Sequence, residues 1–268
     1  MDWVWEEKDG CRFLTIPRWW TQGARVFFSS RAGGASTGPW AELNLGLHVG
    51  DEPGQVAQNR DKLARAVGLA DYAWYAARQV HGNDVVVVDA QAAGTPSQPG
   101  ALGDADGIAT RRRGAVLMGF FADCAPLFFF APRRQVVALA HAGWRGTVGK
   151  VAQEAVYRLE QEFDCRRGDL QVAIGPCIGV CCYQVGAEVI ELVRERFGSA
   201  GEAFLGHRNN ALYLDLAGLN RFILVAAGVP AQSIITSRYC TSCHPELFFS
   251  HRREAGKTGR MAGGIALR

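Results

Sequence analysis

Three segments of the chain place a metal-binding side chain where an apolar run meets a turn that contains glycine or proline. They are Gln79-Val80-His81-Gly82, Ala122-Asp123-Cys124-Ala125-Pro126 and His141-Ala142-Gly143-Trp144-Arg145-Gly146. Strand ends that open into tight turns can present side chains to a shared cleft, and glycine there lets the backbone approach a ligand. Two imidazoles and one thiolate suit Zn²⁺, and three protein ligands leave a fourth position for water or substrate. His81, Cys124 and His141 are therefore candidate ligands of one catalytic zinc ion.

The spacing of these residues does not by itself identify a metal site. They lie 43 and 17 positions apart, which matches no compact zinc-finger pattern. On spacing alone, two hydrogen-bonded histidines and a buried cysteine would be the more common arrangement. Two histidines and a cysteine also form the ligand set of blue-copper sites. A multicopper oxidase needs many more histidines, several in H-x-H pairs, whereas this chain has six and no such pair, so copper is disfavoured.

The remaining cysteines offer weaker candidates. Cys177 follows a Gly-Pro turn and could line the site, but no basic neighbour in sequence would activate it as a nucleophile. For Cys181 and Cys182 we expect a packing role. Cys240-Thr241-Ser242-Cys243-His244 matches the C-x-x-C-H pattern of covalent haem attachment, but haem is attached to exported chains and we expect no export signal here, so no haem is expected. A zinc site at this segment would need two further ligands, and none lies at finger-like spacing.

The elements that would position these residues are strands and helices in mixed order. β-branched and aromatic runs predict buried strands at residues 84–89, 115–121, 135–140 and 170–174. One apolar face at helical spacing predicts a helix over residues 149–163, and Asp215 is placed to cap a second helix that runs to Ala226. A weaker helix pattern covers residues 56–67, and residues 92–103 have the composition of an exposed loop. This mixture favours α/β or α+β layers.

Composition limits the class of protein. The chain has 268 residues, 48% hydrophobic and 21% charged, which suits a single domain over residues 1–268 with a sizeable core. A net charge of +3 is too small to indicate a nucleic-acid partner, and no run of residues is long and apolar enough to indicate a transmembrane helix. The first residues include acidic side chains where a signal peptide needs positive charge, so we expect a cytoplasmic protein. Eight cysteines in such a compartment would stay as thiols or metal ligands.

Five motifs in order resemble the YfiH family, also called the polyphenol oxidase or laccase-domain, purine nucleoside phosphorylase and peptidoglycan editing factor PgeF family. They are the three segments above together with Asp104-Ala105-Asp106-Gly107 and Ile174-Gly175-Pro176-Cys177-Ile178-Gly179. Further similarity lies around Arg31-Ala32-Gly33-Gly34, Asn44-Leu45-Gly46 and Ser250-His251-Arg252-Arg253. The resemblance implies zinc bound by His81, Cys124 and His141, in a layered α/β/β/α sandwich like the catalytic domain of cytotoxic necrotizing factor. His251 stands where many relatives have tyrosine.

The resemblance also implies activity on purine nucleosides: phosphorolysis of adenosine, inosine, guanosine and methylthioadenosine, and deamination of adenosine to inosine. Deamination needs a water molecule activated by metal and a proton-transfer group, and Cys124, Asp123 and Arg145 are the candidate catalytic residues. Phosphorolysis needs a pocket for inorganic phosphate, best built from arginine and glycine-rich turns. Arg31 and Arg145 fit this description, with Arg252 as the next candidate.

Other candidates and an alternative activity remain open at this point. Asn44 and Asp123 could contact ribose, base or water, or could serve only as hydrogen-bonding groups in turns. Cys177 is expected to line the pocket, because the family places this turn nearby. The alternative activity is an amidase that removes L-serine from a UDP-muramyl peptidoglycan precursor, and a copper-dependent polyphenol oxidase is less favoured. In each case the partner is a small molecule.

Overall fold

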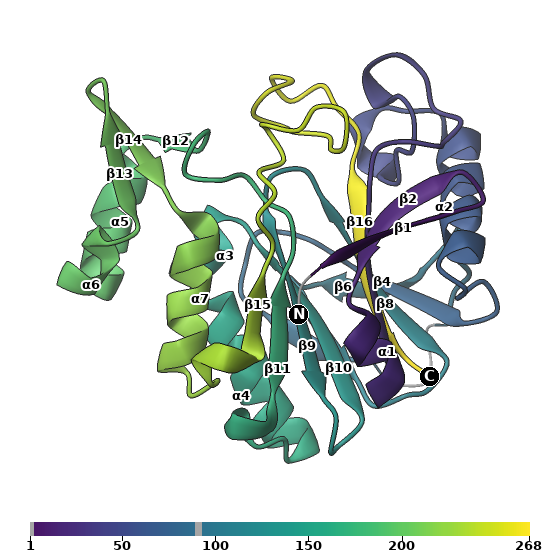
Figure 1. Ribbon diagram of the computed structural model, residues 1–268, viewed down its shortest axis with the longest axis horizontal. Helices are drawn as coiled ribbons and strands as arrows, with labels where there is room; N and C mark the ends of the chain where they lie inside the picture. Colours follow the sequence, from purple (N-terminus) through teal and green to yellow (C-terminus); the bar gives the residue numbers. More distant parts are fainter. Residues whose placement is uncertain (1–2, 89–92) are drawn as a thin grey trace.

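The computed structural model describes residues 3–88 and 93–268, and it is built around two stacked mixed sheets (Figure 1). The first sheet has seven strands in the spatial order β1 (Val4–Lys8), β2 (Cys11–Thr15), β3 (Ala24–Ser29), β16 (Met261–Leu267), β8 (Ala115–Phe121), β4 (Ala73–Arg78) and β6 (Gly100–Asp104). The second has six, in the order β15 (Ile234–Thr236), β11 (Gln171–Ile174), β9 (Ala125–Ala131), β10 (Val136–Ala142), β7 (Gly107–Thr110) and β5 (Val85–Val87).

Side chains on the facing sides of the two sheets form the central core. Alternate residues of a strand point to opposite faces, so each sheet contributes every second side chain to this core. From the first sheet these include Phe28 and Leu117, and from the second Phe128, Val137 and Leu139, all at most 3% exposed. Trp19 on α1 (Pro17–Gln22) closes one side and lies 5.7 Å from the Phe130 ring. The opposite face of each strand is left for a helix to cover.

Helices cover the outer face of each sheet and complete four layers in the order helix, sheet, sheet, helix. Leu63 and Ala64 of α2 (Pro53–Ala66) pack on the first sheet. On the second sheet, α4 (Val151–Phe163) and α7 (Leu216–Ala226) bury Val156 and Leu219 against alternate residues of β9 and β10. The short α3 (Trp144–Val148) lies beside them (Figure 1). The expected likeness to cytotoxic necrotizing factor stays a prediction.

A smaller unit lies beyond α7 (Figure 1). It consists of α5 (Ala187–Phe197), α6 (Ser199–Glu202) and a three-stranded sheet of β12 (Gln184–Val185), β14 (Ala211–Leu214) and β13 (Leu205–Arg208). Phe204, which leads into this sheet, packs 5.5 Å from Phe222 of α7, so the unit is continuous with the outer helical layer. Within the described residues, none of the helices has the length and apolar character needed to cross a bilayer.

Several predicted elements are confirmed, one prediction needs correction, and one strand was not predicted. β8, α4, α7 and α2 lie where the patterns place them, and the Asp215 carboxylate accepts a hydrogen bond from the Gly218 N–H as a helix cap. Residue 89, the last of the first predicted strand, falls outside the described part of the chain. The loop predicted for residues 92–103 is wrong from Gly100 onward, because β6 pairs with β4. β9 was not predicted, because Pro126 interrupts its apolar pattern.

Candidate metal centre

The register of the second sheet brings two of the predicted ligands together. β9 and β10 are antiparallel, with Ala125 opposite Ala142 and Pro126 opposite His141. Cys124, directly before β9, therefore lies beside His141 near the end of β10. His141 shares the face of Val137 and Leu139, so alternation along β10 directs its ring between the sheets. His81 reaches the same place in the turn after β4 of the first sheet, so the centre lies where the two sheets meet.

The three ligand atoms lie within 4.8 Å of one another. Cys124 Sγ is 3.9 Å from His81 Nε2, and the His81 and His141 ring centroids are 4.9 Å apart. His81 is exposed, Cys124 half-buried and His141 buried, so the cluster extends inward from the surface. A Cβ added at Gly143 would lie 2.9 Å from His81 Cδ2 and 3.1 Å from Cys124 Sγ. Glycine at this position therefore leaves the space in which the ligands converge.

Asp106, just before β7, holds two of the ligand segments in place. Its buried carboxylate accepts hydrogen bonds from the backbone N–H groups of Val80, His81 and Gly82, at 3.1, 3.1 and 2.6 Å. Its Oδ1 also lies 2.8 Å from His141 Nδ1, and the His141 N–H donates to the Asp106 carbonyl at 2.7 Å. This contact leaves His141 Nε2 as the metal-binding atom.

Asp106 lies in one of the five motifs that resemble the family, but its role is not evident from the sequence. The feature of the sequence that could have indicated this role is an acidic residue directly before a glycine. Its hydrogen bonds depend on β7 lying beside β10, where Gly107 is opposite Ala140, and this pairing is not written in the local sequence.

The surroundings of Cys124 favour the ionised, thiolate form of its side chain. Burial opposes ionisation of Cys124, but the charge and hydrogen bond of His141, followed by His81, outweigh burial and lower the pKa of the thiol to about 6. Burial also opposes the charged form of His141, but Cys124 and Asp106 raise the pKa of this imidazole to about 9. Thiolates and neutral imidazoles bind metal, so a metal ion at this site would replace the proton on His141.

Asp123 is buried beside Cys124 and holds the C-terminal segment against the centre. Its Oδ1 accepts a hydrogen bond from Thr241 Oγ1 at 2.6 Å. Its Oδ2 accepts from Ser250 Oγ at 3.0 Å and from the Arg252 N–H at 2.7 Å. Protein donors therefore contact both oxygens of Asp123, which positions the C-terminal segment, and the catalytic role expected for Asp123 stays a prediction. Thr241 and Ser250 were missed, because they follow Asp123 by more than a hundred residues.

Two of the predicted substrate contacts make hydrogen bonds within the protein. Asn44 is completely buried, and its amide nitrogen donates to Asp51 Oδ2 at 2.8 Å while its Oδ1 accepts from the Gly46 and Arg260 N–H groups. Arg31 donates two hydrogen bonds to the Ala41 carbonyl and forms an ion pair with Glu254 at 2.9 Å. Its guanidinium also lies 4.5 Å from the Phe249 ring. Both side chains therefore hold loops together, and their contact with substrate stays a prediction.

The other predicted arginines remain accessible. Arg145 is exposed at the start of α3, with its guanidinium 4.5 Å from the Trp144 ring. Arg252 is also exposed, its backbone is tied to Asp123, and its guanidinium lies 5.3 Å from the Tyr183 ring. Cys177 is 4% exposed, and burial raises the pKa of its thiol. A raised pKa opposes a nucleophilic role for Cys177.

Arg260 was not predicted, although it lies beside a glycine as Arg145 does. Burial lowers the pKa of its guanidinium, while the negative charges of Cys124 and Asp123 oppose this effect. A Cβ added at Gly46 would lie 2.7 Å from Arg260 Cγ and 3.4 Å from His48 Cε1, so both side chains pack on this glycine. Arg260 therefore adds a positive charge in the neighbourhood of the thiolate.

The stacked mixed sheets and the two histidines and cysteine at their junction define a class of layered α/β proteins with a candidate metal centre. A sequence model described as multi-copper polyphenol oxidoreductase laccase matches residues 25–268. The chain belongs to this family, the YfiH family.

Curated relatives and solved structures agree with this assignment. The chain is 41% identical to the purine nucleoside phosphorylase YlmD of Geobacillus stearothermophilus over 249 residues, 92% of this chain and 91% of YlmD. It is 34% identical to adenosine deaminase RL5 of an unknown prokaryotic organism, with 91% and 94% covered. The crystal structure of YlmD superposes with a TM-score of 0.91 at 40% identity, with 98% of each chain covered. Bacillus licheniformis YfiH also gives 0.91, at 35% identity, covering 98% of this chain and 99% of that one. The chain is therefore an enzyme.

Proposed function

We propose that this enzyme acts on purine nucleosides with zinc at His81, Cys124 and His141, in phosphorolysis of adenosine, inosine, guanosine and methylthioadenosine and in deamination of adenosine. The observation that carries the proposal is this ligand cluster, supported by Asp106, in a chain similar to enzymes named for these two reactions. One thiolate and two imidazoles fit Zn²⁺ and leave a position for substrate. When bound, zinc would supply Lewis-acid activation of an oxygen of substrate or water.

Residues around the centre would orient the metal ligands, position the C-terminal segment and bind phosphate. Asp106 fixes the orientation of His141, and Asp123 holds the segment of Thr241 and Ser250 beside Cys124. Arg145 and Arg252 are the accessible guanidinium groups that would bind the phosphate used in phosphorolysis. Because deamination requires no phosphate, the two reactions would place different demands on these arginines.

A comparison of substrates on one zinc-loaded preparation tests the proposal. We expect ammonia release from adenosine, and hypoxanthine release from inosine that depends on phosphate. UDP-muramyl-L-serine is included as the competing substrate. A much higher kcat/KM for this precursor than for any nucleoside, or no turnover of nucleosides, would overturn the proposal.

Changes to Arg145 and Arg252 separate the two nucleoside reactions. Lysine does not reproduce the bidentate contact of a guanidinium with phosphate, so Arg145→Lys or Arg252→Lys should cost on the order of 1.5–3 kcal/mol in phosphorolysis. This is about ten- to a hundred-fold in rate, with a raised phosphate requirement and little change in ammonia release. Arg158→Lys on the exposed side of α4 is the matched control. Unchanged phosphate dependence in both variants would place the phosphate elsewhere.

A further inference from the structure

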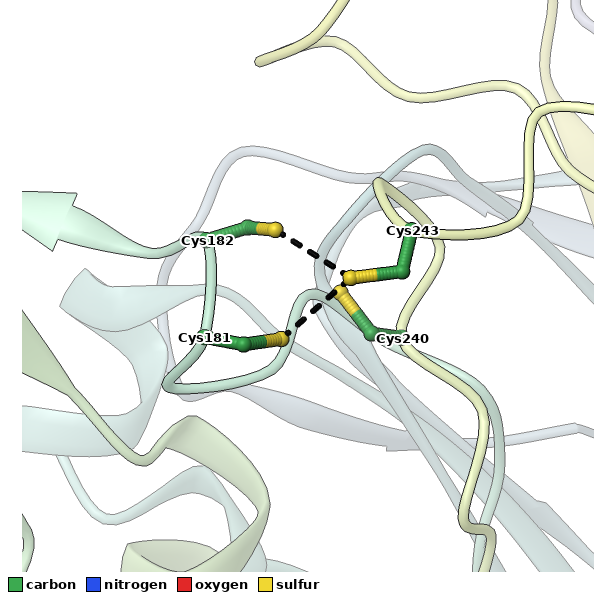
Figure 2. Close-up of side chains that lie close together, drawn as sticks. All are labelled: Cys181, Cys182, Cys240 and Cys243. Carbon is green, nitrogen blue, oxygen red and sulfur yellow. Dashed lines mark hydrogen bonds between the residues drawn. The ribbon is translucent and has the colours of Figure 1, made fainter.

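Four cysteines from two distant segments meet at one side of the candidate metal centre. Cys181 and Cys182 follow β11, and Cys240 and Cys243 lie in the segment after β15. All four Sγ atoms lie within 4.8 Å of one another. Figure 2 shows the two pairs of side chains pointing toward one another from facing loops. The expectation that Cys240 and Cys243 have no further thiol partners is therefore wrong, because the partners come from the fold and not from local spacing.

The distances between the sulfurs are close to those expected for four thiolates around one metal ion. Cys243 Sγ is 3.5 Å from Cys181 Sγ and 3.4 Å from Cys182 Sγ. Four thiolates at about 2.3 Å from a tetrahedral Zn²⁺ would lie about 3.8 Å apart. The four sulfurs, all within 4.8 Å of one another, would therefore reach zinc geometry through shifts of about an ångström or less. A disulfide, in contrast, requires sulfurs about 2.0 Å apart and would use only two of the four thiols.

The backbone of both segments is arranged to hold the thiols in this position. The Gly179 N–H donates a hydrogen bond to Cys240 Sγ at 3.2 Å, the kind of contact that stabilises a thiolate ligand. A Cβ added at Gly179 would lie 3.1 Å from Cys181 Sγ and 3.3 Å from Cys240 Cβ, so glycine allows the loops to approach. The Thr241 N–H donates to the Cys177 carbonyl at 3.0 Å, which pairs the two segments directly.

Each of the two cysteine loops is held by an arginine that donates to its backbone carbonyls. Arg208 donates to the Cys181 carbonyl at 2.7 Å. Arg253 donates to the carbonyls of Thr241 and Ser242 at 2.8 and 3.1 Å. Each of the two loops therefore carries one guanidinium on its backbone, close to a site where four thiolates and one divalent cation would leave a net charge of −2.

We propose that Cys181, Cys182, Cys240 and Cys243 bind a second Zn²⁺, separate from the one at His81, Cys124 and His141. Four cysteine ligands fill the tetrahedral coordination of zinc, so this ion is structural. It ties the loop after β11 to the loop after β15. Thr241 lies between the two ligands of the second loop and donates to Asp123, so the ion also fixes the hydrogen bond beside Cys124.

Zinc content per chain tests the proposal on the full-length protein, purified with reductant and without chelator. We expect about two zinc ions in the wild type. One ion should remain in Cys124→Ser, and one in the double variant Cys182→Ser/Cys243→Ser. The matched control is Cys165→Ala, which changes a buried cysteine that belongs to neither cluster and should keep both ions.

X-ray absorption at the zinc edge gives a second measurement that does not depend on the folding of the double variant. In Cys124→Ser, the remaining zinc should have about four sulfur neighbours at about 2.3 Å and no imidazole. A Cys124→Ser protein with no zinc, or one whose zinc lacks about four sulfur neighbours, would overturn the proposal. A wild type with one zinc that Cys124→Ser keeps would instead contradict the proposed zinc at His81, Cys124 and His141.

The same preparation shows whether the four cysteines form a disulfide or a metal site, and which metal they bind. Thiol titration in denaturant after metal removal should find all eight cysteines. Six thiols together with a single zinc would show a disulfide in place of the metal site. Stoichiometric iron with visible absorption would overturn the assignment of zinc, because four thiolates also suit iron.

Discussion

Asp106 contacts two of the three segments that carry the predicted metal ligands, and it contacts them in different ways. Its oxygens accept the N–H groups that shape the His81 turn, and Oδ1 lies against His141 Nδ1. An asparagine would keep the size of the side chain but could not accept all of these hydrogen bonds with both of its polar atoms. The metal affinity of the centre should therefore depend on the carboxylate itself.

We expect Asp106→Asn to weaken zinc binding at His81, Cys124 and His141 by about ten- to a hundred-fold, since a partner of a ligating histidine has effects of this size. Competition with a chelator of known affinity measures the change. Asp104→Asn is the control, because Asp104 is nearby but exposed and is paired with Arg78. Equal losses in the two variants would show that Asp106 has no special role.

The three ligands could be proposed from the sequence because each combines a suitable side chain with a turn at the end of an apolar run. For polar residues in the same kind of glycine-rich motif, the sequence leaves the partner undetermined. Asn44 and Arg31 lie in such motifs, but their hydrogen bonds connect loops of the protein itself. The sequence does not show whether a polar side chain faces a ligand or a neighbouring loop, since that depends on pairing between distant segments.

At the scale of elements, the segment after β15 is held in place by Glu254. Its carboxylate accepts hydrogen bonds from Arg31, Arg253, the Ser250 N–H and Thr258. Burial opposes its ionisation, but the bonds from Thr258, Arg253 and Ser250 outweigh burial and lower the pKa of Glu254. A carboxyl with a lower pKa in the folded state stabilises the protein above its unfolded pKa, and this contribution disappears as pH falls through the folded pKa.

Glu254→Gln should therefore lower the free energy of unfolding by on the order of 1–3 kcal/mol near neutral pH. The difference between wild type and variant should become smaller as pH falls below about 4.5, where Glu254 of the unfolded chain begins to be protonated, and it should disappear as pH falls through the lower pKa of folded Glu254. Urea unfolding at a series of pH values measures this. Glu195→Gln on the exposed side of α5 serves as the control. A difference that does not depend on pH would contradict the role of the charge.

Helices and strands whose apolar residues follow one clear pattern could be predicted from the sequence. Strands that form by pairing with a distant segment could not. α4 shows one apolar face, and β8 is a continuous apolar run. β6 has the composition of a loop and is a strand only because the edge of β4 supplies hydrogen bonds. β9 contains Pro126 at its second residue, where a missing N–H donor is tolerated near the strand end.

For the molecule as a whole, close contact between the two sheets depends on small residues opposite large ones. A Cβ added at Gly263 of β16 would lie 2.8 Å from Phe128 Cζ of the facing sheet. Gly263→Ala should therefore cost on the order of 1–3 kcal/mol through overpacking. Adding Phe128→Leu removes part of the clash, so the double variant should lose less stability than the sum of the two single variants.

Chemical denaturation of the four proteins in this cycle gives the coupling free energy between the sheets. Gly54→Ala, at an open position early in α2, should be neutral or slightly stabilising and is the control. Strict additivity of the two changes would mean that Gly263 and Phe128 do not contact each other across the core.

β16 lies in the middle of the first sheet, although it comes late in the chain. It is hydrogen-bonded to β3 on one side and to β8 on the other. During translation, β3 and β8 are therefore synthesised long before β16, the strand that pairs with both. Until then, the backbone N–H and C=O groups on one edge of each strand stay unpaired. Such a high contact order slows folding, and open edges can pair with other nascent chains. In the cell, this enzyme should depend on chaperones until synthesis reaches β16.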